Sequence, residues 1–114
     1  MALSSDTVMV MVEGDLLPDL TLTLKDANGN TVSRAGFTAV IVCRPIGGGT
    51  ATRLTGAWLD SPTNTRVTHA WTTATRLAVG VWYVEVETDP NGASDQWTFP
   101  TETPCQLVVR AGMG

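Results

Sequence analysis

The stretch Asp26-x-Asn28-x-Asn30 has residue types and spacing close to those of a metal-binding motif. Side-chain oxygens at alternate positions open an EF-hand calcium loop, which also requires glycine at its sixth position and glutamate at its twelfth. Those two positions hold Thr31 and Phe37. Because an Asn-Gly pair accommodates positive φ angles, the stretch is predicted to be a hairpin turn and not a calcium site.

The residues that could carry nucleophilic or metal chemistry are few and far apart in the chain. The single histidine, His69, lies between Val67 and Trp71 on the apolar side of an alternating stretch. This pattern predicts a packed, hydrogen-bonded side chain and not a general base beside a nucleophile. Zinc needs several ligands close together, whereas the two cysteines stand at positions Cys43 and Cys105. We therefore expect no metal and no cofactor.

Two further patterns match enzymes only superficially. Glu85 and Glu87 share one strand face about 7 Å apart, a separation similar to that of the paired carboxylates of a glycosidase, but such pairs on an outer strand face are usually solvated. The glycines at 47–49 are not followed by Lys-Ser/Thr, and no Gly-x-Ser-x-Gly elbow occurs. Since no group of residues satisfies the requirements of a catalytic site, we expect a protein that is not an enzyme.

The composition limits the classes of partner. The 114 residues carry a net charge of −4 with a pI of about 4.6, and 16% of them are charged, against about 25% in an average soluble domain. Lys25 is the only lysine and the arginines are scattered, so no basic stripe could neutralise phosphates. We expect no binding to nucleic acid and no attraction to an anionic membrane.

The start of the chain and its longest apolar stretch indicate where the protein is made. Residues 1–6 lack the basic segment and apolar run of a signal peptide. Residues 35–43 form the longest apolar stretch, which is too short to span a bilayer. We expect synthesis in the cytoplasm, where cysteines remain thiols.

Alternating hydrophobicity and closely spaced turn signals predict an all-β protein. We expect a single immunoglobulin-like domain over residues 1–114, built as an antiparallel β-sandwich of seven to eight strands. A domain of this type needs roughly 100 residues, so the length of the chain fits. The expected strands cover residues 7–12, 20–25, 37–44, 52–59, 66–71, 81–88, 96–99 and 105–110.

Two of the expected strands are apolar on both faces, although a sandwich strand normally has one face in water. One lies in the N-terminal strand or arm, residues 1–13, and the other in residues 37–43. Either a loop or neighbouring side chains cover the second face, or that face contacts a partner, and a strand at the N-terminus can also pair with a sheet edge of another chain. The candidate interface residues here are Val8, Met9, Val10, Met11, Val40 and Val42.

The four tryptophans divide into two pairs. Trp71 and Trp82 fit core positions of alternating strands, whereas Trp58 and Trp97 are less constrained by the pattern. Packing in the core or between subunits is one interpretation of Trp58 and Trp97. The other is an exposed platform on which sugars stack.

Several segments, in order, resemble small tailed-phage virion structural proteins with an immunoglobulin-like domain. A Gly-Asp-x-x-Pro stretch leads into a Leu/Thr strand and an Asp-x-Asn-Gly-Asn turn over residues 14–30, and residues 37–44, 66–71, 80–87 and 95–101 continue the match. The resemblance covers about residues 8–110, and the family with which it is strongest is the N-terminal domain of phage baseplate upper proteins.

The resemblance implies a virion building block, synthesised in the host cytoplasm, whose partners are other virion proteins and further copies of itself. Baseplate upper proteins carry receptor-binding parts after this domain, whereas this sequence ends at Gly114. The expected function is therefore a capsid decoration (cement) protein or small accessory subunit bound in many copies. The alternatives are a tail or baseplate accessory protein, and a module that binds carbohydrate on a cell surface.

Overall fold

The regular structure of this chain is β throughout the residues that the computed structural model describes, which are 8–16, 19–26, 28–89, 97–99 and 105–112. This part of the chain contains nine strands and no helix. The strands are β1 (Val8–Val12), β2 (Leu20–Thr23), β3 (Thr38–Pro45), β4 (Thr52–Thr55), β5 (Ala57–Trp58), β6 (Arg66–His69), β7 (Gly80–Asp89), β8 (Trp97–Phe99) and β9 (Cys105–Arg110).

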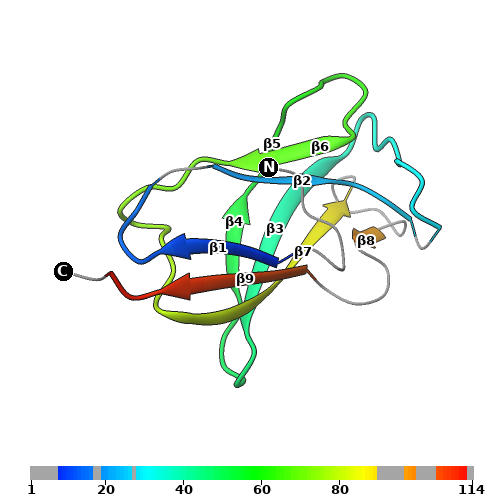
Figure 1. Ribbon diagram of the computed structural model, residues 1–114. Helices are drawn as coiled ribbons and strands as arrows, with labels where there is room; N and C mark the ends of the chain where they lie inside the picture. The colour runs from blue at the N-terminus through cyan, green and yellow to red at the C-terminus, as the bar shows by residue number, and fades with distance from the viewer. Residues whose placement is uncertain (1–7, 17–18, 27, 90–96, 100–104, 113–114) are drawn as a thin grey trace.

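The strands form two sheets that pack into a sandwich (Figure 1). The larger sheet has the order β1-β9-β7-β3-β4, with β8 also paired to β7, and the smaller sheet has the order β2-β6-β5. Strands β8 and β9 lie end to end along one side of β7, because β8 pairs with residues 86–88 and β9 with residues 80–84. The prediction of an all-β sandwich is confirmed.

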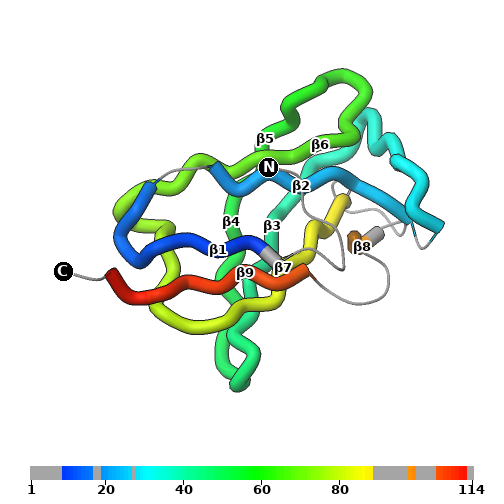
Figure 2. Tube along the Cα trace, viewed as in Figure 1, coloured from blue at the N-terminus to red at the C-terminus, as the bar shows by residue number. Residues whose placement is uncertain are grey.

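Two details of that prediction are wrong. The sandwich is not wholly antiparallel, because β1 runs parallel to β9, so the first and last described strands lie side by side (Figure 2). The single strand expected over residues 52–59 is two strands in different sheets, β4 paired with β3 and β5 paired with β6. The described residues therefore contain nine strands where seven or eight were expected.

Gly56 is the point at which the chain passes from one sheet to the other. Its amide nitrogen bonds to the carbonyl oxygen of Ala39 at 3.3 Å. A Cβ atom at this position would stand 2.6 Å from a methyl carbon of Val67 in the other layer and 3.1 Å from that same carbonyl oxygen. Only a residue without a side chain allows the two layers to approach so closely.

The core between the sheets follows from the alternation of side chains along each strand. Leu20, Leu22 and Leu24 cover the inner side of the smaller sheet, and Val84 and Val86 lie opposite on β7. Each such side chain, once buried, contributes roughly 1.5–3 kcal/mol to folding. Trp82, which was expected at a core position, packs against this cluster.

The two cysteines belong to this core as buried thiols. Cys43 pairs with Val84 in the register of β3 and β7, and Val84 pairs with Cys105 in the register of β7 and β9. The cysteines are thus two strands apart, roughly 10 Å by ordinary strand spacing, which is too far for a disulfide. Burial raises the pKa of the Cys43 thiol to about 12, so this sulfur does not ionise near neutral pH.

Two local predictions about candidate chemistry are confirmed. The Asp26 carboxylate accepts hydrogen bonds from the amides of Asn28 and Asn30, both at 2.9 Å, as in an Asx turn. The ring nitrogens of His69 lie 2.9 Å from the carbonyl oxygen of Thr55 and 3.0 Å from the hydroxyl of Thr75. His69 is thus a buried, hydrogen-bonded residue, and Asp26 organises a turn.

Candidate interaction surface

The N-terminal strand β1 has one face in the core and one in solvent. Met9 and Met11 are only 1% and 6% exposed, whereas Val10 is 56% exposed. The prediction that Met9 and Met11 offer an adaptable contact surface is therefore wrong, because both methionines fill the space between the sheets. Val10 remains as a candidate, and the side chain of Val8 lies outside what the structure describes.

Val10 begins a straight row of apolar residues across the outer face of the larger sheet. It is in register with Val108 on β9, and Val108 is in register with Val81 on β7. The amide of Ile46, directly after β3, bonds to the carbonyl oxygen of Val81 at 3.0 Å. We call Val10, Val108, Val81 and Ile46 the outer row.

The outer row is accessible to solvent along its length. Val81 is 37% exposed and Ile46 43% exposed, while Val108 is half-buried between its neighbours. The next register on the same face carries polar groups, since Gln106 is paired with Tyr83 and Tyr83 with Arg44. An apolar strip beside a polar border is the composition found in protein interfaces.

Three of the four residues in the outer row were not candidates from the sequence. The alternation of β7 places Val81 on the same face as Glu85 and Glu87, so the pattern held a signal for Val81. No such signal existed for Val108 and Ile46, because their relation to Val10 depends on which strands are neighbours.

The outer face of β3 is covered by side chains of the same sheet. Arg53 is in register with Val42, and its guanidinium nitrogen Nη2 lies 2.7 Å from the Glu87 carboxylate, which is in register with Val40. This ion pair crosses β3 between the two valines, and the aliphatic part of a long side chain can shield apolar surface beneath it. Val42 is only 4% exposed and Val40 is half-buried, so Val42 is wrong as an interface candidate.

Val42 is paired with Arg53 on β4 and, on its other side, with Glu85 on β7. Burial raises the pKa of the Glu85 carboxyl group, nearby Arg44 opposes this, and Glu87 adds to it. The folded protein therefore holds this proton more tightly than the unfolded chain does. The free energy of unfolding should fall as the pH rises from the unfolded pKa, about 4.3, through the higher folded value.

We expect Glu85→Gln to raise the free energy of unfolding at neutral pH, because the variant no longer ionises in a partly buried position. Below about pH 4 the carboxyl is protonated in both states, so the variant and the wild type should be nearly equally stable. Urea unfolding at a series of pH values measures the difference. An equal loss of stability at every pH would contradict this account of Glu85.

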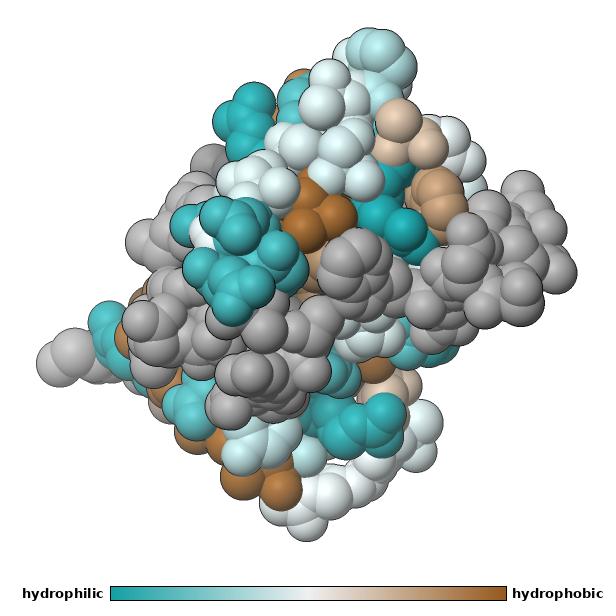
Figure 3. Space-filling view, turned by 90° about the vertical axis from the view of Figure 1, so that its right-hand side faces the viewer, coloured by the Kyte–Doolittle hydropathy of each residue, from teal (hydrophilic) through white to brown (hydrophobic). Residues whose placement is uncertain are grey.

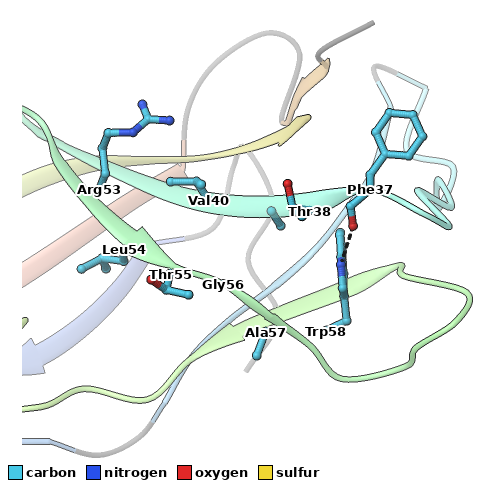
Figure 4. A pocket seen from close by; sticks show the side chains of 10 residues that line it. Phe37, Thr38, Val40, Arg53, Leu54, Thr55, Gly56, Ala57 and Trp58 are labelled. Atoms are coloured by element: carbon cyan, nitrogen blue, oxygen red, sulfur yellow. Dashed lines mark hydrogen bonds between the residues drawn. The ribbon is translucent and has the colours of Figure 1, made fainter. Parts of the chain in front are cut away.

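A shallow groove of about 530 Å³ lies where β4 diverges from β3. Figure 4 shows Arg53 towards one end of the groove, Phe37 and Trp58 at the other, and Val40 between them. The indole nitrogen of Trp58 donates a hydrogen bond to the carbonyl oxygen of Phe37 at 2.9 Å, and its ring is half-buried against the core. The structure thus brings two predicted candidates, Val40 and Trp58, to one groove.

The other tryptophans add no exposed aromatic platform among the side chains that the structure describes. Trp71 is buried and stacks edge-on against His69, with ring centroids 5.4 Å apart. Trp82 packs against the core. The candidate Trp97 lies in β8, but its side chain lies outside the described residues.

Apolar surface is unevenly distributed over the molecule. On the side that faces right in Figure 1, the coloured residues show apolar side chains only as separate small patches among polar ones (Figure 3). The outer row, by contrast, is continuous across β1, β9 and β7 to Ile46 at the end of β3. It is therefore the strongest candidate for contact with another protein.

The described residues hold no group of three or more histidine, cysteine, aspartate or glutamate side chains placed to bind a metal ion. Nor does this part of the chain contain a helix with the length and apolar character needed to cross a membrane. Comparison with models of protein families, with curated proteins and with solved structures gives no match to the chain.

Proposed function

We propose that the protein is a non-enzymatic structural protein of a tailed-phage virion, where many copies dock through the outer row. The observation that carries the proposal is the outer row itself, which places apolar side chains, three of them exposed, side by side on the outer face of the larger sheet. Exposed apolar strips with polar borders are typical of surfaces that bind other proteins.

The resemblance to phage virion proteins with an immunoglobulin-like domain supplies the class of assembly. The strand order supports the immunoglobulin-like assignment, because β9, β7 and β3 are neighbours in one sheet and β2, β6 and β5 in the other. Immunoglobulin domains divide their strands in the same way, with G, F and C in one sheet and B, E and D in the other.

The size of the outer row favours docking in many copies. A specific interface buries roughly 800 Å² on each partner, whereas a patch of four such side chains amounts to at most a few hundred. One copy would then bind weakly, and a lattice that engages many linked copies gains avidity without new contacts. We therefore propose a decoration subunit of the capsid, with a tail or baseplate position as the alternative.

Quantitative mass spectrometry of purified virions tests this function. We expect a copy number that matches a symmetric lattice, dozens to hundreds of subunits for a capsid and few for a tail or baseplate. Absence of the protein from purified particles would contradict the proposal.

We expect Val81→Lys to weaken attachment to particles at least about tenfold, the ratio that corresponds to 1.4 kcal/mol. The lysine would place an uncompensated charge in the middle of the outer row, while the fold tolerates a substitution at this exposed position. Thr23→Lys, on the outer face of the smaller sheet, serves as the control. Co-sedimentation with particles measures attachment, and equal binding by both variants would show that the outer row is not the contact.

The groove at Trp58 supports a second candidate function, which is the binding of carbohydrate. Aromatic rings beside polar groups can hold a sugar, and Phe37, Trp58 and Arg53 line this groove. Binding to a glycan array that is lost in Trp58→Ala but kept in Val81→Lys would favour the second candidate over the first.

A further inference from the structure

The free edge of β1 differs from the other sheet edges that the structure describes. Strand β1 ends the order of the larger sheet, and β4 is at the opposite end. Natural proteins protect sheet edges with charges, prolines, bulges or very short strands. The β4 edge carries the charged Arg53, and the edge strands β2, β5 and β8 have only four, two and three residues.

None of these protections is present in β1. Its five residues are all apolar, and it pairs with β9 along its whole length, which leaves its other side as the edge of the sheet. Val10 at its centre is 56% exposed. A regular, uncharged edge strand of this kind is a template for pairing with another strand.

The sequence of β1 identifies the strand that fits this edge. Val-Met-Val-Met-Val reads the same in both directions. An antiparallel copy with Val10 opposite Val10 therefore places methionine opposite methionine on the inner face and valine opposite valine on the outer face. A two-fold axis brings residue i against residue j and j against i, and here both members of every pair carry the same side chain.

We propose that β1 pairs antiparallel with β1 of a second copy of this chain, about a two-fold axis beside Val10. The two larger sheets then form one continuous sheet of twelve strands, ten along the main order and β8 of each copy beside β7, which is near the upper limit for open sheets. Because the axis passes beside Val10, the two outer rows meet there end to end. The joined row has eight apolar side chains in place of four.

Engineered cross-linking tests the geometry. Opposite residues of antiparallel strands have Cα atoms about 4.5 or 5.5 Å apart, and both distances permit a disulfide. We expect Val10→Cys to form a covalent dimer under mild oxidation, while Val81→Cys, which is also exposed but two strands from the axis, should not. Both native cysteines are buried, so they do not compete.

Charge substitution tests the same contact without a covalent bond. Analytical ultracentrifugation should show Val10→Lys and Val10→Glu each as monomers, because like charges would face each other across the axis. An equimolar mixture of the two should dimerise, at least about tenfold more tightly than either alone. The wild type should dimerise more tightly at high salt, since each copy carries a net charge of −4 that salt screens.

The proposal is overturned if the wild-type protein stays monomeric at all concentrations tested, or if Val10→Cys cross-links no faster than Val81→Cys. It is also overturned if the mixture of Val10→Lys and Val10→Glu stays monomeric. These experiments use the purified protein without particles. A failure to dimerise is thus distinguishable from a failure to attach to virions, which Val81→Lys tests.

Discussion

Replacing Met9 by alanine should lower the free energy of unfolding by about 2–5 kcal/mol, the usual cost of truncating a buried methionine. The Met9 side chain is 1% exposed and belongs to the core cluster between the sheets. Its removal leaves a cavity where β1 closes the edge of the sandwich. Chemical denaturation followed by tryptophan fluorescence measures the loss, because Trp71 and Trp82 report on that core.

The neighbouring residue provides a matched control. Val10→Ala removes a side chain that is 56% exposed, so we expect a loss below about 1 kcal/mol, mainly from the weaker strand propensity of alanine. If both substitutions lowered the free energy of unfolding equally, the Met9 side chain would not be packed in the core. Met9 would then again be a candidate for contact with a partner.

Replacing Gly56 by alanine should destabilise the protein by about 1–3 kcal/mol or more, the range found when extra atoms are forced into a packed interior. The added Cβ would stand 2.6 Å from the Val67 methyl and 3.1 Å from the Ala39 carbonyl oxygen. The carbonyl belongs to the backbone of β3, so relief requires the two layers to separate. Thermal unfolding by circular dichroism measures the change.

Gly47→Ala is the control for Gly56→Ala. A Cβ at Gly47 would meet nothing within 4 Å, and replacing glycine at such a site restricts mainly the unfolded chain. We expect Gly47→Ala to be neutral or slightly stabilising. Equal effects of the two alanines would show that the loss at Gly56 is not a steric effect of close packing.

The sequence predicts a strand and its buried face well where the other face of that strand is in solvent. Strand β7 was expected over residues 81–88 and extends over Gly80–Asp89, and Val84 and Val86, which alternate with Glu85 and Glu87, face the core. Alternation is sufficient there, because the outward positions Tyr83, Glu85 and Glu87 are polar or charged. His69 was predictable for the same reason, as it shares a face with Val67 and Trp71.

Where a strand is apolar on both faces, its own residues do not indicate which face is buried and which is exposed. In β1 the exposed face belongs to Val10, and in β3 the second face is closed by Arg53, which reaches across to Glu87. Arg53 and Glu87 are 34 positions apart in the chain, so their pairing depends on sheet order, which alternation does not encode. The outer row depends on the same order.

The split of the expected strand at residues 52–59 has a similar cause. Its pattern is continuous on both sides of Gly56, so nothing in the spacing indicates that Ala57 and Trp58 belong to the other sheet. The glycine was a signal, because glycine within a strand often marks a close approach of backbone. The sequence does not show which segment packs against Gly56, because that depends on which strands are neighbours.

The parallel pairing of β1 with β9 also affects how the chain folds while it is synthesised. Strand β1 leaves the ribosome well before its partner β9, because residues 13–104 are made between them. At ordinary rates of translation the nascent chain would carry its uncharged first strand without a partner for on the order of ten seconds. During that interval neighbouring chains on one polysome could pair through β1 before either has folded, so chaperone binding to this segment would help to keep newly made subunits apart.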